Sequence, residues 1–253
     1  KHIYKSSDYG NTWENIGEYD ERYNYDKIIL AENDTTKFYI FNGYDIIFYC
    51  LDSLGTYHQT YLYFNSNLNL NYKPSCLERI NDKIFIGLND NNGWNSEIMG
   101  IWKIINGDSI VGKVLEIPSI NWPVNEIKYL SNGKAIAVGG YGIYKSTDFG
   151  ENWTVKSSGI QSYTNVNQIH LYGDNEIYFT CSDNIFFRSY DSGIIWEMLK
   201  FPGSYSIHSF DIDKKGNLFV GAGGNGVWKS TDKGESWHSA TDTLRLSCVP
   251  SIG

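Results

Sequence analysis

The sequence is poor in the residues that build metal, redox and catalytic sites. Charged residues make up only 20% of the 253-residue chain, which has 5 His and 4 Cys. No Cys forms a C-x-x-C pair, and no His lies at a spacing typical of a metal site or a catalytic triad. We therefore expect neither a metal nor a cofactor. The cysteines are Cys50, Cys76, Cys181 and Cys248; buried free thiols and a single disulfide both remain open for them.

Positive charge and long apolar runs are also scarce. The chain has 21 Lys and Arg against 29 Asp and Glu, which gives a formal net charge of −8. This balance argues against nucleic acid or an anionic membrane surface as a partner, because both need a basic face. No apolar run is long enough to span a bilayer, so no membrane insertion is expected. Helical periodicity is missing too, which predicts an all-β protein.

One short motif is abundant. The pattern Ser-x-Asp-x-Gly-x-x-Trp occurs at Ser6–Trp13, Ser146–Trp153, Ser189–Trp196 and Ser230–Trp237. Each copy follows an apolar run and opens a second one, as in a β-hairpin. In such a turn the carboxylate accepts backbone N–H groups, Gly permits a positive φ, and Trp returns to bury its indole. We expect a structural role for the residues Asp8, Trp13, Asp148, Trp153, Asp191, Trp196, Asp232 and Trp237.

This motif resembles the Asp box, or BNR repeat, of sialidase-like β-propellers, sortilin-type receptor domains and related secreted proteins. The run Ile143–Trp153 also looks like the repeats of bacterial exported proteins similar to photosystem assembly factors. The resemblance implies the architecture and leaves the function open, because Asp boxes occur in enzymes, lectins, receptors and assembly factors.

The spacing of the motif matches the period of a propeller. Successive aspartates at 148, 191 and 232 are 43 and 41 residues apart, which is one four-stranded blade per repeat. We predict one β-propeller domain over residues 1–253, built of four-stranded antiparallel blades with the Asp-box turns between strands C and D. Partial blades at 1–18 and 243–253 are expected to close one blade. Six blades are favoured, with seven as the alternative if the chain continues. Because the sequence opens in mid-motif, we also expect a leader ahead of Lys1.

A ligand site is expected on the face opposite the Asp boxes, where the B–C and D–A connections lie. One B–C loop there, residues 89–97, is long and carries the Trp94 indole, and two neighbouring D–A connections, residues 65–74 and 117–124, are extended. Aromatic side chains flanked by Asn and carboxylates suit a sugar, which offers apolar C–H faces and hydroxyls. The predicted ligand-binding residues are Trp94, Asn91, Asn92, Glu97, Trp122 and Tyr72; the alternative is that Trp94 and Trp122 only cap blade edges.

These patterns favour a binding or scaffold protein without catalysis, whose partner is a protein or a glycan. Sialidase activity is disfavoured, because the chain has only the arginines Arg22, Arg79, Arg188 and Arg245 and no Arg-Ile-Pro segment. A glycoside hydrolase of another kind is the alternative, with Asp90, Glu97 and Glu126 as candidate acids. A structural segment of a larger surface protein or assembly is a third possibility. The resemblance implies a secreted, periplasmic or cell-surface location.

Overall fold

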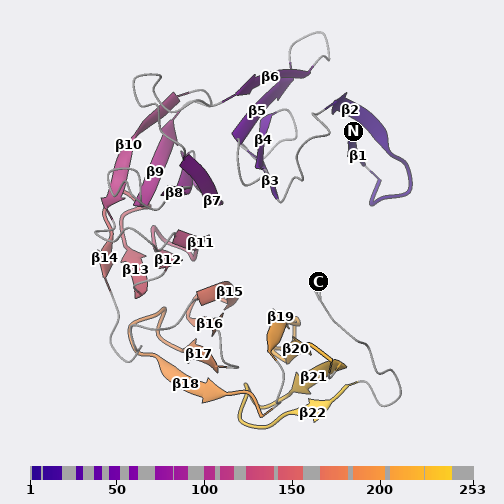
Figure 1. Ribbon diagram of the computed structural model, residues 1–253, viewed down its shortest axis with the longest axis vertical. Coiled ribbons are helices and arrows are strands. Elements are labelled where there is room, and N and C mark those ends of the chain that lie inside the picture. The colour runs from indigo at the N-terminus through magenta and orange to yellow at the C-terminus, as the bar shows by residue number, and fades with distance from the viewer. Residues whose placement is uncertain are drawn as a thin grey trace. The chain divides into compact units, whose positions relative to one another are not determined.

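The computed structural model describes two compact units, residues 1–120 and 121–253, which are treated separately below (Figure 1). Within them the structure describes the residues 2–6, 8–18, 27–30, 37–41, 46–51, 57–61, 72–81, 83–90, 100–105, 109–116, 124–139, 142–155, 166–181, 185–202, 206–224 and 226–240. In these ranges every regular element is a β-strand, so none of them contains a helix that could cross a membrane.

The first unit contains one strand pair and two four-stranded sheets. The pair joins β1 (His2–Lys5) to β2 (Glu14–Glu18) through the first copy of the motif. One sheet consists of β3 (Lys27–Leu30), β4 (Lys37–Phe41), β5 (Ile46–Leu51) and β6 (Tyr57–Tyr61). The other consists of β7 (Tyr72–Ile80), β8 (Lys83–Asp90), β9 (Gly100–Ile105) and β10 (Ser109–Glu116). All pairings are antiparallel, between strands that follow one another in the chain.

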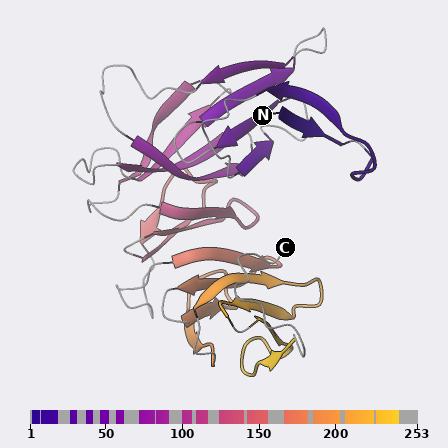
Figure 2. The ribbon, with the colours of Figure 1, turned by 45° about the vertical axis from the view of Figure 1, so that its right-hand side comes forward.

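The second unit contains three sheets of the same kind, which follow one another in Figure 2. The first has β11 (Val124–Tyr129), β12 (Ala135–Gly139), β13 (Gly142–Ser146) and β14 (Thr154–Val155). The second has β15 (Val166–Tyr172), β16 (Glu176–Cys181), β17 (Ile185–Ser189) and β18 (Glu197–Lys200). The third has β19 (Ile207–Ile212), β20 (Leu218–Ala222), β21 (Gly226–Ser230) and β22 (His238–Ser239). These are the predicted antiparallel four-stranded blades.

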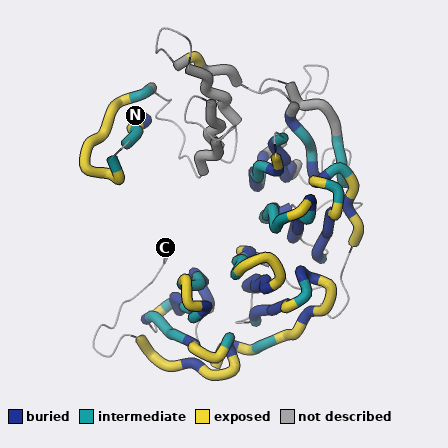
Figure 3. Tube along the Cα trace, turned by 180° about the vertical axis from the view of Figure 1, so that it is seen from behind, coloured by how far each residue is buried: buried dark blue, intermediate teal, exposed yellow. Residues whose placement is uncertain are grey.

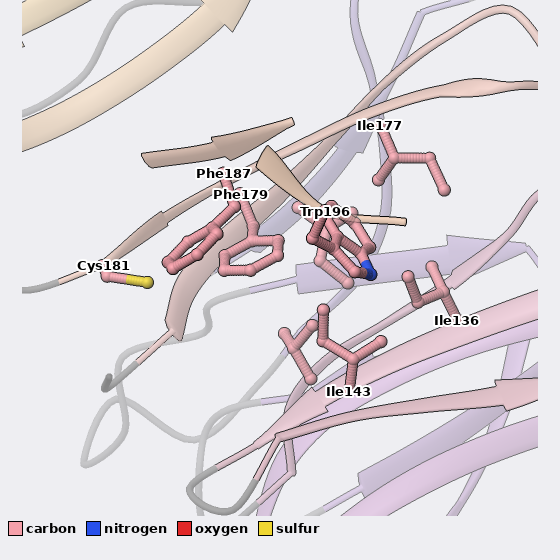
Figure 4. Close-up of a cluster of buried hydrophobic side chains, with 9 residues drawn as sticks. Ile136, Ile143, Ile177, Phe179, Cys181, Phe187 and Trp196 are labelled. Atoms are coloured by element: carbon pink, nitrogen blue, oxygen red, sulfur yellow. The ribbon is translucent and has the colours of Figure 1, made fainter. Parts of the chain in front are cut away.

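The core of this second unit lies between the sheets. Ile136 and Ile143 of one sheet pack against Phe179, Phe187 and Trp196 of the next (Figure 4). A second cluster joins the β15–β18 sheet to the β19–β22 sheet. The two middle strands of the first two sheets are almost completely buried, whereas the last strand of each sheet is mostly exposed (Figure 3). Two-sided burial explains why these strands read as continuous apolar runs.

Two cysteines in the described residues, Cys76 and Cys181, are buried and are not joined in a disulfide. Cys181 lies within the cluster that joins the first two sheets of the second unit. A thiol packed in this way acts as a small apolar side chain. Cys248 and the side chain of Cys50 lie outside the described residues, as does the strand expected near the C-terminus within residues 243–253.

The four copies of the motif form four turns of nearly identical geometry, called the repeat turns below. In the turn at Ser146–Trp153, the Ser146 hydroxyl donates to Asp148 Oδ1 at 2.8 Å and accepts the Gly150 N–H at 2.9 Å. Asp148 Oδ1 also accepts the Asn152 N–H at 2.9 Å. The glycines have φ between 80° and 96° (Gly10 90°, Gly150 83°, Gly193 80°, Gly234 96°), the left-handed region that favours Gly.

A second residue of each repeat turn is also left-handed, which the motif does not reveal. Tyr9, Phe149, Ser192 and Lys233, which precede the glycines, have φ of 60°, 59°, 59° and 62°. A non-Gly residue there costs roughly 1 kcal/mol or more, so its surroundings must hold it in place. The Phe149 N–H donates to Gly133 O, and the Ser192 N–H donates to Asn175 O. Each acceptor lies in the first turn of the same sheet, so these two turns share one face.

The repeat turns also connect neighbouring sheets of the second unit. Lys145, just before the second repeat turn, donates from Nζ to Ser192 O in the third turn at 2.6 Å. Arg188, just before the third turn, donates to Lys233 O in the fourth at 2.8 Å. The same basic position and the same left-handed acceptor are therefore used twice. These bonds link sheet to sheet on the face of the repeat turns, beyond the apolar packing.

Candidate binding face

The first strand of every sheet in the second unit has a β-bulge near its start. Pairing of β11 with β12 skips Asn125, pairing of β15 with β16 skips Asn167, and pairing of β19 with β20 skips His208. In the first unit the same irregularity skips Ser75 of β7. A bulge releases one residue from the ladder, bends the strand and redirects side chains, and such bulges are frequent beside functional sites.

The bulges lie at the end of the strands away from the repeat turns. Val124, at the start of β11, is paired with Gly139, where β12 ends. The other end of β11 leads to the turn containing Gly133, which is bonded to Phe149 of a repeat turn. The strands β11 and β15, and β15 and β19, contact each other, so the three bulges follow one another along one face. We call this edge of residues 121–253, marked by Asn125, Asn167 and His208, the bulge face.

His208 lies against the backbone of the glycine-rich B–C turn. A Cβ added to Gly223 would lie 2.4 Å from His208 Nε2, so a larger residue at this position would displace the imidazole. The turn is fastened to the start of β19, because the Gly223 N–H donates to Ser206 O at 3.1 Å. The Gly-rich stretch therefore forms a tight turn under an exposed imidazole. It does not lead into a helix, so it lacks the helix N-terminus on which a phosphate cradle depends.

A row of titratable side chains crosses the same three first strands further along. Glu126 and Lys128 on β11 form an ion pair of 3.0 Å, and Glu126 also accepts the Ile169 N–H of β15. His170 of β15 packs edge to face against Phe210 of β19, with 4.8 Å between ring centroids. Its Nε2 is buried and has no hydrogen-bond partner among the described residues. Burial lowers the pKa of His170, against the opposing charges of Glu126 and Asp211.

This row can offer a ligand the carboxylates of Glu126 and Asp211, whereas His170 Nε2 is buried behind them. With its pKa lowered, His170 is uncharged at neutral pH, when Nε2 can donate or accept depending on the tautomer. The described residues contain no group of three or more metal-ligating side chains close enough to hold an ion. The exposed imidazole of His208 and the carboxylates of Glu126 and Asp211 suit recognition of polar backbone or hydroxyl groups.

Most of the predicted ligand-binding residues lie outside the described residues, namely Asn91, Asn92, Trp94, Glu97 and Trp122. The exception is Tyr72, which begins β7 and is paired with Asp90; nothing is described of its side chain. Two boundaries in the sequence analysis were wrong. Asn89 and Asp90 were placed in a loop, whereas β8 continues through Asp90, and residues 72–74 were placed in a connection, whereas β7 begins at Tyr72. Asp90 pairs with Tyr72 and Asn89 pairs with Lys73, so β8 continues beyond its apolar residues.

The sequence analysis missed the bulge residues and His170. Each bulge has a recognisable pattern, a buried or apolar residue followed by two small or polar ones, as in Val124-Asn125-Glu126 and Ile207-His208-Ser209. Recurrence of this pattern at the start of each first strand would have revealed them. His170 had no such signal, because only packing against Phe210 and the charges on the neighbouring strands distinguish it from other strand histidines.

Comparison with known proteins relates this arrangement to solved structures, while no protein-family model and no curated protein matches the sequence. The YCF48 protein from Cyanidioschyzon merolae superposes with a TM-score of 0.62 at 13% identity, over 94% of this chain and 77% of that one. The structure titled YCF48 bound to D1 peptide gives 0.62 at 15%, over 86% and 68%. An ancestral GH74 enzyme gives 0.62 at 15%, over 94% of this chain and 35% of the enzyme.

The chain has a β-propeller fold. At these identities the similarity shows the fold alone, since propellers with unrelated activities share it. The four-stranded blades, their chain-order pairing and the contacts between first strands agree with that architecture. In this propeller the repeat turns and the bulge face occupy opposite ends of the strands in residues 121–253, so two separate surfaces must be considered.

Proposed function

We propose that the chain is an exported Asp-box propeller that binds a protein or a glycan and has no catalytic activity. The observation that carries this proposal is the bulge face, where Asn125, Asn167 and His208 leave the ladder at equivalent points of three successive blades. Groups repeated at the spacing of the blades can contact an extended ligand at several points. We also propose that residues 1–253 form one domain of six blades, and that the protein acts at the cell surface, in the periplasm or outside the cell.

A peptide is the favoured ligand class. Support comes from YCF48, a propeller of similar fold whose structure is titled as bound to D1 peptide. The row behind the bulge face adds acceptors at Glu126 and Asp211. Backbone amides of an extended peptide present donors and acceptors in alternation, which such a surface can match. Trp94 and Trp122, which are predicted to lie on B–C and D–A connections, would add aromatic contacts on the side of their blades opposite the repeat turns.

Selection from a phage-displayed random peptide library, in parallel with a glycan array, tests this proposal. The immobilised wild-type protein should enrich ligands that bind His208→Ala and Trp94→Ala at least about ten-fold more weakly. His238→Ala is the matched control, because His238 is an exposed histidine on the outer strand β22. Ligands that bind His208→Ala as tightly as wild type would remove the bulge face from the proposal. A failure to enrich any ligand would contradict binding as the function.

A glycoside hydrolase is the second candidate. The GH74 enzyme shares the fold, and Glu126 and Asp211 place two carboxylates on either side of His170. Hydrolysis needs an acid and a second carboxylate flanking the scissile bond. The test is a screen for turnover of aryl glycosides and polysaccharides. Turnover that is lost in Asp90→Asn, Glu97→Gln or Glu126→Gln would establish hydrolysis in place of simple binding. We expect no turnover.

A further inference from the structure

His170 occupies a position that recurs on the three first strands of the second unit. Lys128 on β11, His170 on β15 and Asp211 on β19 each lie three residues after the bulge of their strand. The strand β15 contacts both β11 and β19. The register therefore places an imidazole between a strand that carries a cation at this position and a strand that carries a carboxylate. A charge on His170 would interact with both neighbours.

The packing around His170 brings a second carboxylate beside the ring. The ring lies edge to face against Phe210, with 4.8 Å between centroids, and Asp211 follows Phe210 directly. On the other side, the Ile169 N–H donates to Glu126 of β11. His170 Nε2 is buried and has no hydrogen-bond partner among the described residues. Two carboxylates on neighbouring strands thus flank a buried ring nitrogen that makes no bond of its own.

His170 is the group of this row that changes charge in mild acid. Burial lowers its pKa below the ordinary 6.5, Lys128 acts in the same direction, and Glu126 and Asp211 act against it. The imidazole is therefore neutral at neutral pH and gains a proton as the pH falls. Tyr178, its cross-strand partner on β16, has a raised pKa and donates to a neighbouring carboxylate, so it stays protonated over this range.

We propose that His170 is a pH-dependent switch of the bulge face, which holds its ligand at neutral pH and releases it in mild acid. Protonated His170 needs an acceptor for its buried Nε2–H, and Glu126 and Asp211 are the anionic groups beside it. An imidazolium paired with these carboxylates withdraws the acceptors that the row offers to a ligand. The inference rests on the proposed binding function and adds its regulation.

The first measurement needs no ligand. NMR titration of the imidazole Cε1–H signals between about pH 8 and about pH 4.5 gives the midpoint of each histidine. The His170 signal is identified by its loss in His170→Phe, which keeps a ring against Phe210, or in His170→Gln. We expect His170 to titrate at lower pH than His238, which is exposed on β22. The side-chain carboxyl carbons of Glu126 and Asp211 should shift with the His170 midpoint in wild type and lose that step in His170→Phe.

The second measurement follows a peptide that is enriched on the wild-type protein at neutral pH and binds His208→Ala more weakly. Its Kd by fluorescence anisotropy should rise about five-fold or more between about pH 7.5 and about pH 5.5, because the ligand favours the uncharged form of His170. In His170→Phe this ratio of Kd values should fall toward one. His238→Phe is the matched control and should keep the wild-type ratio.

The outcomes separate the switch from the binding site. A His170 midpoint at or above that of His238, or carboxyl signals that do not follow His170, would overturn the switch whether or not a peptide binds. Equal Kd ratios in wild type and His170→Phe would overturn it too, and would leave the bulge face as a binding site. Failure to enrich any peptide would contradict the proposed function, and release of a ligand with it.

Discussion

The repeat turns at Ser146–Trp153 and Ser189–Trp196 have one backbone and two different surfaces. Their left-handed residues have the same φ of 59° at Phe149 and Ser192, and the Ser–Asp–Gly bonds coincide within 0.1 Å. Around this backbone, Asn152 and the Trp153 N–H are bonded, whereas Ile195 is exposed and Trp196 Nε1 has no partner among the described residues. The turn is thus specified by few residues, and the others are free to vary with the surface.

The largest effects should come from removing the indoles. Trp153 and Trp196 are 9% and 6% exposed, so replacing either by Ala should lower the free energy of unfolding by about 3–5 kcal/mol. Replacement of each Trp by Phe should have a different effect in the two turns. Trp153→Phe loses the 2.8 Å bond to Gly150 O, whereas Trp196→Phe removes a donor without a partner, so Trp153→Phe should cost about 1 kcal/mol more. Urea unfolding of the four variants measures this; equal costs for the Phe pair would contradict it.

Neutralising the aspartates should have a smaller and unequal effect. In wild type Asp148 Oδ2 accepts a hydrogen bond from Asn152 Nδ2 at 2.7 Å. In Asp148→Asn an amide nitrogen at that position would face the same donor. In Asp191→Asn an amide nitrogen at the position of Oδ2 faces one backbone N–H, at 3.2 Å, and no other donor among the described residues. We expect Asp148→Asn to cost about 1 kcal/mol more than Asp191→Asn. Denaturant midpoints at neutral pH provide the test, with Asp174→Asn, in an exposed turn, as a control.

Acid should weaken all the repeat turns. Hydrogen bonds from Thr12 and Ser6 lower the pKa of Asp8 from 3.8 to about 2. Burial would raise the pKa of Asp148 and of Asp191, but the bonds from their turns outweigh it and lower both. A carboxyl with a lowered folded pKa contributes stability above its unfolded pKa and loses it as pH falls through the folded one. The unfolding free energy should therefore decline between about pH 4 and pH 2.

Unfolding of wild type and Asp148→Asn across that range provides the measurement. The variant has no carboxyl to protonate at this position, so its stability should fall less steeply with acid. Parallel curves for the two proteins would show that the turn carboxylate does not contribute to acid sensitivity.

The smallest effect should come from Ile195→Asn. The new amide can donate to Asp191 Oδ2 as Asn152 does to Asp148, and it removes an exposed apolar side chain. We expect a change within about 0.5 kcal/mol, toward higher stability. A loss above about 1 kcal/mol would mean that Ile195 is held by the fold, which would contradict its exposed position.

Much of the architecture could be predicted from the sequence, because the repeat turn is a local structure. Gly at the positive φ, Ser and Asp within four residues of the groups they bond, and apolar runs on both sides specify a hairpin without help from distant residues. The spacing of the copies then gave four-stranded sheets and a propeller fold. The ligand residues predicted on the long loop remain a prediction, because they lie outside the described residues.

Only the tertiary structure decided what surrounds each turn. Trp13 and Trp153 have the same motif and the same indole bond, yet Trp13 is 63% exposed and Trp153 only 9%. Burial of an indole depends on which residues from other strands reach it, as Ile136 reaches Trp196. The same holds for His170, whose pKa is lowered by burial in spite of the carboxylates of Glu126 and Asp211 on neighbouring strands. A local pattern fixes dihedral angles and short-range bonds, whereas burial and charge environment are sums over residues far apart in the chain.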